Sequence, residues 1–347
     1  MVNNIGVKFK SIPHQYPVIG EHIEVVHNKI NIDSYPLKQD ELLVKNLYIS
    51  LDPYMRGRMR SPEIKSYIHA FTVGEILEAG GISEVIKSNN PKYKVGDLYS
   101  GMVGWEEYSV ITAKNANQNA MFTEGLNAAK SSNIPLSYFL GILGMPGMTA
   151  YTGLFKIGQP KKDETIFVST AAGAVGQVVC QISKMLGLCV IVDFLLNEMK
   201  LDGAFNYKKY DLKKKLDELC PNGIDIYWDN VGGETLDVTL LQLNKHARVI
   251  SCGMISQYNV EEPYSIKNIM CVLTKSLLIQ GFIVFDYYDE MYEKFLKEMN
   301  EWLKSSKLKY KEDVVEGIEK APEAFLGLLN GKNFGKLVVK VDKNTKL

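Results

Sequence analysis

The sequence predicts an α/β protein in which a doubly wound parallel sheet is joined to a second, mainly β domain. The chain has 347 residues, more than one ordinary hydrophobic core accommodates, so we expect two domains. Short extended runs punctuated by Gly, Pro and Asn fill residues 1–125, which is typical of a β domain. Over residues 126–305, strand-like and helical segments alternate, which indicates a parallel sheet.

Two separate parts of the sequence are expected to form the β domain. Its clearest extended runs are ELLVKNLYISLDP at residues 41–53 and EEYSVITA at residues 106–113. The tail, residues 306–347, contains the helical segment APEAFLGLLNGK and then the strand-like FGKLVVKV, with Gly335 as the expected turn residue between them. We expect this tail to return to the first domain.

The parallel sheet is predicted from apolar runs that alternate with helical segments. The expected strands are IFVST at 166–170, LCVIV at 188–192, IDIYWDN at 224–230, ARVISCG at 247–253 and LLIQGFIV at 277–284. The expected helices lie around Val178 and over residues 212–219 and 236–243. Continuous apolar runs of this kind suit strands that are covered on both faces.

Residues 164–192, ETIFVSTAAGAVGQVVCQISKMLGLCVIV, are the most informative stretch of the chain. They are typical of a buried strand, a tight turn, a helix and a second strand, with Ala171, Gly173 and Gly176 at the three small-residue positions of GxGxxG. Gly173 would let the backbone approach a pyrophosphate, and Gly176 would let the helix pack closely on the strand. An ordinary tight turn is the alternative. The flanking strands and helix favour half of a dinucleotide-binding site.

Charge and composition exclude several classes of function. Forty basic residues balance forty acidic ones, so the chain lacks the positive field that nucleic acids and anionic membranes require. Residues 134–155 are uncharged but contain Pro135, Pro146 and four glycines, which argues against a membrane span. The first residues lack the apolar core of a signal peptide, so we expect a soluble, cytoplasmic enzyme that acts on a small molecule.

Five motifs together resemble one protein family. They are LDPYMRGRM at 51–59, GMPGMTAYTGL at 144–154, STAAGAVGQ at 169–177, DNVGG at 229–233 and CGMISQYN at 252–259. This combination resembles the zinc-independent medium-chain dehydrogenases/reductases. Within them it is similar to the alkenal/one double-bond reductases, the group that includes leukotriene hydroxydehydrogenase, also called prostaglandin reductase. The likeness extends from about residue 40 to residue 340.

The resemblance implies both a fold and a reaction. The fold is a Rossmann domain with a GroES-like catalytic domain, and the cofactor is NADP(H). The reaction is the metal-free reduction of the C=C bond of α,β-unsaturated aldehydes or ketones, by hydride transfer to the β-carbon. Two alternatives stay open, an NAD(P)-dependent alcohol dehydrogenase and a non-catalytic redox sensor that binds NADPH. Tyr54 and Tyr258, both present, favour catalysis.

The sequence gives no sign of a metal site. Zinc needs three or four converging Cys, His or carboxylate ligands. The five histidines form no HxxxH or GHE arrangement, and the five cysteines lack CxxC spacing. They are His14, His22, His27, His69 and His246, with Cys180, Cys189, Cys220, Cys252 and Cys271. We therefore expect neither a zinc site nor a disulfide framework, and expect hydrogen bonds to polarise the substrate.

Two tyrosines are the catalytic candidates. Tyr258 follows a strand of the nucleotide domain, where ligands bind beyond the carboxyl ends of strands. Its neutral hydroxyl can donate to an enolate oxygen, and the resemblance implies contact with the nicotinamide ribose and the substrate oxygen. Tyr54 resembles the family's substrate-pocket tyrosine. The alternatives are that Tyr258 only packs, or that Arg56 and Arg58 mark a solvated loop above a packed Tyr54.

Further cofactor contacts are implied by the resemblance. The pyrophosphate is assigned to Ala172, Gly173, Ala174 and Val175, and the nicotinamide ribose to Asn230. The nicotinamide side is assigned to Cys252, Gly253, Met254, Ile255, Ser256, Gln257 and Tyr258. Backbone groups of Phe282, Ile283 and Val284 would meet the carboxamide, and Asn333 would reach across from the tail. The structural alternatives are that Asn230 is a turn asparagine, that residues 282–284 belong to a buried strand, and that Asn333 lies at the end of a helix.

The choice between NADP and NAD depends on the residues after the second strand. Asp193 stands 20 residues after Gly173, where an acidic residue would bind the ribose 2′-hydroxyl of NAD. In that interpretation a helix starting at Asp193 directly follows the strand that ends at Val192, although connections between a strand and a helix take about 2 to 6 residues. We therefore expect about eight residues to be absent between Val192 and Asp193. Tyr207 resembles the family residue that stacks near the 2′-phosphate, so we favour NADP.

The apolar run LLIQGFIVFD, residues 277–286, suggests a homodimer. The relatives that the chain resembles often pair through this edge of the sheet. A bare apolar edge strand would risk aggregation, so a second copy is its expected cover. The alternative is a helix of the same chain that covers the strand.

Overall fold

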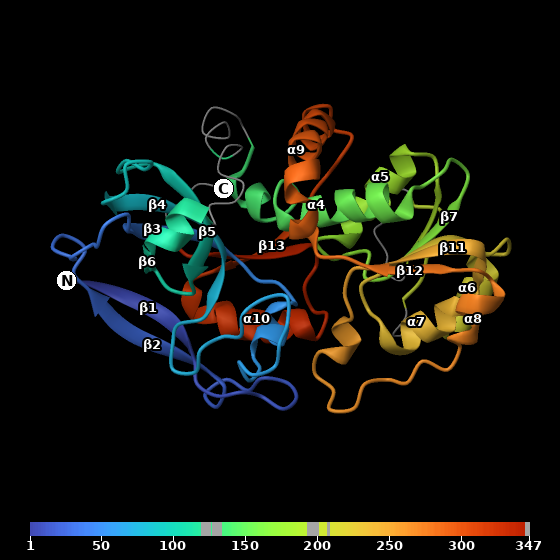
Figure 1. Ribbon diagram of the computed structural model, residues 1–347, viewed down its shortest axis with the longest axis horizontal. Coiled ribbons are helices and arrows are strands. Elements are labelled where there is room, and N and C mark those ends of the chain that lie inside the picture. The colour runs from blue at the N-terminus through green and yellow to red at the C-terminus, as the bar shows by residue number, and fades with distance from the viewer. Residues whose placement is uncertain (119–125, 127–133, 193–200, 207–208, 344–347) are drawn as a thin grey trace. The chain divides into compact units, whose positions relative to one another are not determined.

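A computed structural model describes residues 1–118, 126, 134–192, 201–206 and 209–343 (Figure 1). The chain divides into two compact units. Unit 1 comprises Met1–Gly144 and Glu312–Leu347, and unit 2 comprises Met145–Lys311.

Unit 1 is built on a mixed sheet with the strand order β13-β14-β3-β4-β5, with β6 paired to β3, and on a separate pair of antiparallel strands, β1 and β2. The strands are β1 (Val2–Phe9), β2 (Ile23–Ile30), β3 (Leu42–Ser50), β4 (Glu78–Ser88), β5 (Leu98–Gly104), β6 (Tyr108–Ile111), β13 (Glu312–Glu316) and β14 (Lys336–Lys340). The helical segments are α1 (Met55–Arg58), α2 (Ala113–Gln118), η1 (Leu136–Leu140), η6 (Ile318–Lys320) and α10 (Ala321–Leu329). Strand β14 follows Gly335, whose φ of +87° marks the expected turn, and pairs antiparallel with β3.

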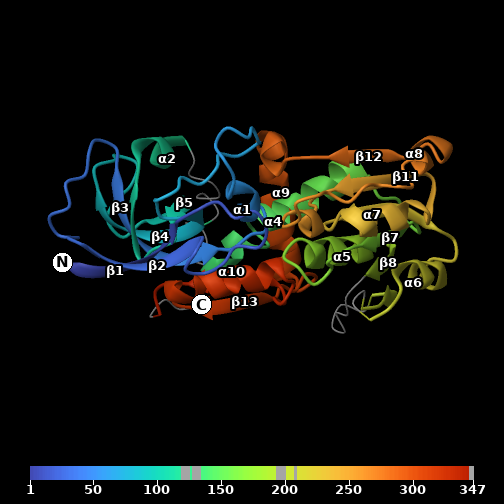
Figure 2. The same cartoon turned by 90° about the horizontal axis from the view of Figure 1, so that it is seen from below.

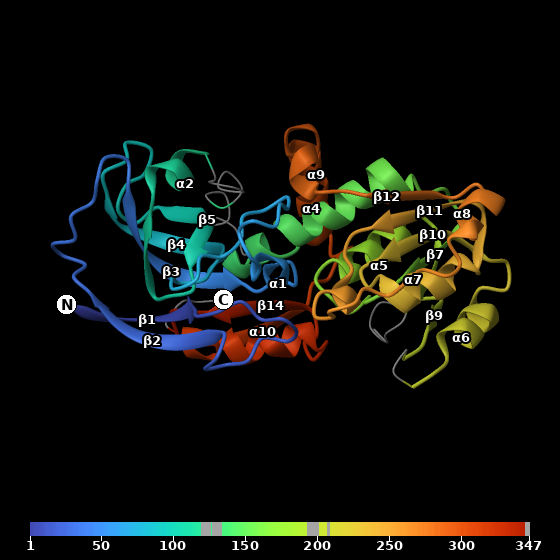
Figure 3. The ribbon, with the colours of Figure 1, turned by 60° about the horizontal axis from the view of Figure 1, so that its bottom comes forward.

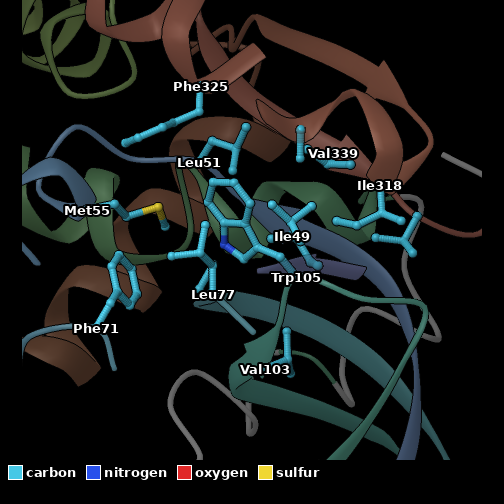
Figure 4. Packing of buried hydrophobic residues seen from close by; sticks show 14 of the residues in the cluster. Ile49, Leu51, Met55, Phe71, Leu77, Val103, Trp105, Ile318, Phe325 and Val339 are labelled. Atoms are coloured by element: carbon cyan, nitrogen blue, oxygen red, sulfur yellow. The ribbon is translucent and has the colours of Figure 1, made fainter. Parts of the chain in front are cut away.

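The core of unit 1 forms around Trp105, which is fully buried (Figure 4). Its ring meets Phe325 of α10 edge to face, with the centroids 5.7 Å apart. Helix α10 also lies against β2, as Figure 2 shows. The apolar face of APEAFLGLL therefore closes the core that strands from both ends of the chain build.

Unit 2 contains a six-stranded parallel sheet with the order β12-β11-β10-β7-β8-β9 (Figure 3). Its strands are β7 (Thr165–Val168), β8 (Cys189–Val192), β9 (Gly203–Ala204), β10 (Ile224–Asp229), β11 (Leu243–Ser251) and β12 (Leu278–Gly281). Every pairing is parallel. The chain order reverses between β7 and β10, so the predicted doubly wound sheet is confirmed, and ligands of such sheets bind at this reversal.

Helices cover both faces of this sheet. They are α4 (Met145–Thr152), η2 (Gly153–Gly158), α5 (Gly176–Met185), α6 (Leu212–Leu219), α7 (Gly233–Leu240), η4 (Ile255–Gln257), α8 (Met270–Thr274), η5 (Val284–Tyr287) and α9 (Tyr288–Lys304). Figure 1 shows α5 on the opposite side of the sheet from α6 and α7. Leu216 of α6 and Leu240 of α7 share a buried cluster with Phe167 and Tyr227 of the strands.

Local signals located some elements better than others. Helix α6 has the predicted bounds, and its N-cap Asp211 accepts a hydrogen bond from the Lys214 amide at 2.8 Å. Strand β11 begins earlier than predicted. Its first residues, around His246, are polar and exposed, so they lack the apolar pattern from which the strand was predicted. The prediction of a single strand over 277–284 is wrong for the second half of that range. Strand β12 ends at Gly281, where Phe282 turns its ring toward Trp228.

A polar network is enclosed in unit 1. The Asn4 side chain donates to Glu106 Oε2 at 3.0 Å, and the Ser109 hydroxyl donates to Glu106 Oε1 at 3.0 Å. Asn46, fully buried, donates in turn to the Ser109 oxygen at 2.9 Å. Burial raises the pKa of Glu106 to about 7, against the lowering effect of the Ser109 and Asn4 hydrogen bonds.

Substituting Glu106→Gln should change how stability depends on pH. In the folded protein Glu106 keeps its proton to about pH 7, whereas the unfolded chain releases it near 4.5. Its stabilising contribution is therefore complete below pH 4.5 and is lost as the pH rises through 7. Between pH 5 and pH 8 we expect the wild type to lose roughly 2–3 kcal/mol relative to the variant in denaturant unfolding. A difference that does not change with pH would contradict this assignment.

Candidate functional site

The turn between β7 and α5 has the geometry that its small residues predict. A Cβ at Gly176 would lie 2.4 Å from the Thr170 carbonyl oxygen and 2.7 Å from the Ala171 Cα, so only glycine fits. At Gly173 it would lie 3.3 Å from the same oxygen, which is a tight contact. The Gly173 amide donates to the Thr170 carbonyl at 3.0 Å, and Thr170 itself has a φ of +56°. The predicted close approach of helix and strand is present at Gly176.

Ala172, Gly173, Ala174 and Val175 are half-buried and directly precede α5. The first amides of a helix have no acceptor within it, and the helix dipole makes this end partially positive. The turn thus offers backbone N–H donors, and at Gly173 no side chain shields the backbone. These are the features that hold a pyrophosphate in dinucleotide-binding proteins.

The end of β10 is joined to the end of β7 through Asn230. Its amide nitrogen donates to Ser169 Oγ at 3.0 Å, and its side-chain Nδ2 donates to the Ser169 carbonyl at 2.7 Å. Its Oδ1 accepts from the Trp228 indole at 3.1 Å. Protein partners therefore fix both the Oδ1 and the Nδ2 atom of the Asn230 side chain, which the sequence pattern did not reveal.

The segment 252–258 lies on the end of β10. The Asp229 carbonyl accepts from the Cys252 amide at 2.9 Å and from the Gly253 amide at 3.1 Å. Asn230 and Val231 accept in the same way from Ile255, at 3.2 Å, and Ser256, at 3.1 Å. The structure thus brings together Asn230 and the residues predicted to wrap the nicotinamide side. These residues are half-buried or exposed, so their surfaces are accessible within unit 2.

Tyr258 is half-buried, and its Oη accepts a hydrogen bond from the Met254 amide at 3.2 Å. This bond uses an oxygen lone pair, so the hydroxyl proton stays available for an acceptor. Burial raises the pKa of Tyr258, and the nearby Cys252 and Asp229 add to the rise while the Met254 bond opposes it. Tyr258 is therefore a neutral hydroxyl at physiological pH.

Cys252, in the same segment, is a thiol rather than a thiolate. Burial first, and the charge of Asp229 second, raise the pKa of Cys252 to about 12. A thiol with such a pKa is a weak nucleophile and a poor metal ligand.

Phe282 and Ile283 connect β12 to η5, which begins at Val284, so none of the three residues belongs to the strand. The Phe282 ring meets Trp228 edge to face, with the centroids 6.3 Å apart. Gly153 lies beneath this pair, because a Cβ there would come within 2.5 Å of Trp228 Cη2 and 2.9 Å of Phe282 Cζ. Gly153 belongs to the motif GMPGMTAYTGL, but the requirement for glycine at this position depends on contacts between distant parts of the chain.

In unit 1, Tyr54 is the N-cap residue of α1 and is half-buried. Arg56 and Arg58 are 7% and 4% exposed, so the alternative of a solvated loop is wrong. Arg56 donates to the Gln15 carbonyl at 2.7 Å, whereas Arg58 pairs with Glu78 at 3.0 Å and lies over the Phe71 ring. Burial raises the pKa of Tyr54, and the nearby Asp52 contributes to the rise.

A buried ion pair fixes the chain just before Tyr54. Lys336 of β14 is 1% exposed, and its Nζ donates to Asp52 Oδ1 at 2.8 Å and to the Leu51 carbonyl at 2.8 Å. Asp52 also accepts from the Ser50 hydroxyl. Asn333, close to Lys336 in sequence, donates its Nδ2 to the Gly335 carbonyl at 2.9 Å and so supports its own turn.

Several predictions fall on residues that the structure does not describe. Tyr207 and Asp193 both lie outside the described residues, as does the junction that follows Val192. Within the described ranges, no group of three or more His, Cys, Asp or Glu side chains is placed to hold a metal ion. Among the same residues, no helix has the length and apolar character needed to cross a membrane.

Comparisons with known proteins match both units. The chain matches two protein-family profiles, the N-terminal domain of oxidoreductase over residues 21–118 and zinc-binding dehydrogenase over residues 174–301. Among solved structures, CurA from Vibrio vulnificus has a TM-score of 0.86 and 36% identity, over 99% of this chain and 100% of that one. The same protein in complex with NADPH has a TM-score of 0.85, over 98% of this chain and 99% of that one.

Among curated proteins, the NADP(+)-dependent 2-alkenal reductase of Nicotiana tabacum is 44% identical over 99% of this chain and 98% of its own length. The (+)-pulegone reductase of Mentha piperita is 43% identical, and the NADPH-dependent curcumin reductase of Escherichia coli is 39% identical, each over 87% of this chain and 88% of its own. The predicted resemblance is confirmed, and the chain belongs to the medium-chain dehydrogenase/reductase family of oxidoreductases, in the group that contains these double-bond reductases.

Proposed function

We propose that the protein is an NADPH-dependent reductase of the carbon–carbon double bond of α,β-unsaturated aldehydes and ketones. The observation that carries the proposal is the 44% identity to a 2-alkenal reductase along 99% of the chain. The turn before α5 fits the coenzyme, because Gly176 lets the helix end approach the strand and Gly173 leaves the backbone bare.

Tyr258 has the properties that the reaction requires of a hydrogen-bond donor. When bound, NADPH supplies the hydride that adds to the β-carbon of the substrate. Negative charge then develops on the carbonyl oxygen, and a fixed donor stabilises it. Tyr258 is suited because its proton is available while its Oη accepts from the Met254 amide. Water supplies the proton that completes the reduction at the α-carbon.

The remaining site residues have proposed roles in binding. Ala172 to Val175 hold the pyrophosphate, Asn230 and residues 252–258 hold the nicotinamide ribose and ring, and residues 282–284 meet the carboxamide. Tyr54 has a proposed role in binding the substrate, and Asn333 in binding the coenzyme. Support for Tyr54 comes from its rigid setting beside the buried pair of Asp52 and Lys336.

The chain also has features of a cytoplasmic homodimer. None of the five cysteines, all in the described part of the chain, forms a disulfide, which suits a reducing compartment. Strand β12 is an edge strand, and Leu278 on it is 47% exposed. Met270 and Leu273 of the neighbouring α8 are 63% and 75% exposed. An apolar edge of this kind is suited to pairing with a second copy.

Replacing Tyr258 by Phe tests the mechanism. Loss of one donor to the developing oxyanion should lower turnover of an enone by about 10- to 1000-fold, with a much smaller change in NADPH affinity. The matched control is Tyr264→Phe, which removes a hydroxyl that bonds to Asp237 instead. Steady-state loss of NADPH absorbance measures turnover. Near-normal turnover by the Tyr258 variant would remove this residue from the catalytic role.

Metal removal should leave the reaction unchanged. Hydrogen bonds, rather than a Lewis acid, polarise the substrate in the proposed mechanism. Dialysis against a strong chelator is therefore expected to preserve turnover, and elemental analysis to find no stoichiometric zinc. Bound zinc together with chelator-sensitive turnover would overturn the proposed chemistry.

Light scattering at micromolar concentration tests the dimer. We expect a mass of twice 39.0 kDa. Leu278→Glu places a charge on the edge strand and should give monomers, because its burial would then cost desolvation. Leu241→Glu is the control, since Leu241 is similarly exposed at 40% but lies at the end of α7. A wild-type protein with the mass of one chain would exclude the dimer.

A further inference from the structure

Asp229 is the last residue of β10, and its side chain is completely buried. Its Oδ1 accepts three hydrogen bonds, from the Tyr227 hydroxyl at 2.7 Å, the Val231 amide at 3.0 Å and the Gly232 amide at 2.8 Å. Two of these donors belong to the turn 230–233. The carboxyl group therefore holds this turn folded back on the strand that leads into it.

The turn 230–233 is packed without clearance against the segment 252–258. Gly232 and Gly233 have φ values of +67° and +52°. A Cβ at Gly232 would lie 2.8 Å from Met254 Cγ, and one at Gly233 would lie 2.4 Å from Gln257 Nε2. A change in the conformation of the turn must therefore move Met254 and Gln257 as well.

Hydrogen bonds add a second link between the same two segments. The Val231 carbonyl accepts from the Ser256 amide at 3.1 Å and from the Ser256 hydroxyl at 2.6 Å. The Asp229 carbonyl accepts from the Cys252 amide, at 2.9 Å. Because the Met254 amide donates to Tyr258 Oη, the chain of contacts ends at the proposed catalytic hydroxyl.

The second carboxyl oxygen of Asp229 is not used in this way. Among the described residues, Oδ2 has no hydrogen-bond partner although it is buried. Burial raises the pKa of Asp229, against the lowering effect of the bonds from Gly232, Tyr227 and Val231. An enclosed carboxyl oxygen without a partner costs free energy, so the three hydrogen bonds to Oδ1 must offset this cost.

We propose that Asp229 is a positioning residue for the nicotinamide half of the coenzyme site. Its carboxyl group sets the turn 230–233 and, through that turn, the segment 252–258 that carries Tyr258. The inference rests on the function proposed above. It predicts that Asp229 controls affinity for the nicotinamide half of the coenzyme and leaves the adenosine half unaffected, because no bond of its side chain reaches beyond Tyr227 and the turn.

Two substitutions with two ligands test this proposal. Asp229→Ala removes the acceptor of both turn amides, and Asp229→Asn keeps an acceptor but places an NH₂ group where Oδ2 has no partner. Asp229→Ala should raise the dissociation constant of NADPH about tenfold or more, and Asp229→Asn about threefold to tenfold. Adenosine 2′,5′-bisphosphate, which lacks the nicotinamide half, should bind within twofold of wild type. Quenching of protein fluorescence measures both affinities.

Asp237 supplies the matched control. It is 2% exposed, and its Oδ1 accepts the amides of Lys267, at 2.9 Å, and Asn268, at 2.7 Å. Asp237→Ala and Asp237→Asn therefore make the same chemical change at a buried aspartate that holds a different loop. They should lower the melting temperature as the Asp229 variants do, while NADPH affinity stays within twofold of wild type.

The outcomes separate the inference from the proposed function. Equal weakening of both ligands in the Asp229 variants would show a general loss of structure and overturn the inference. Unchanged NADPH affinity in both variants would also overturn it. If Asp229→Ala does not fold, the Asp229→Asn comparison decides alone. A wild type that binds NADPH but reduces no enone would contradict the proposed function and leave the affinity comparison intact.

Discussion

The parallel pairing of β7 with β10 is the interaction on which the rest of the site depends. Tyr227 lies beside Phe167, and Trp228 beside Val168, so the two strands end at the same level. Ser169 can therefore bond to Asn230, and the chain reversal places α5 on one face and α7 on the other. Both turns proposed to hold the coenzyme start from this shared edge.

The parts of the site that the sequence predicted are those set by neighbours in the chain. The close approach at Gly176 depends on Thr170 and Ala171, and the start of α6 follows from Asp211 as its N-cap. Such short-range patterns carry their own geometry. The doubly wound sheet was predictable for a related reason, because alternating strands and helices admit few topologies.

The parts that the sequence did not predict depend on residues far apart in the chain. Arg56 resembles a loop residue in sequence, but the carbonyls of Pro13 and Gln15 make its burial favourable. Phe282 looks like the continuation of a strand until Trp228 supplies a place for its ring. Asp229 belongs to the motif DNVGG, but its role could not be predicted, since a buried carboxylate is recognisable only from the donors around it.

The buried pair of Lys336 and Asp52 makes the stability of unit 1 depend on two residues far apart in the chain. The two residues are 284 positions apart, yet loss of either leaves an uncompensated charge in the core. That loss costs about 3–5 kcal/mol, a large share of the roughly 5–15 kcal/mol that stabilises a typical fold. A single substitution at either position therefore destabilises the fold, whereas replacing both residues by apolar ones would remove both charges. Through this pair, a strand near the end of the chain fixes the backbone just before Tyr54.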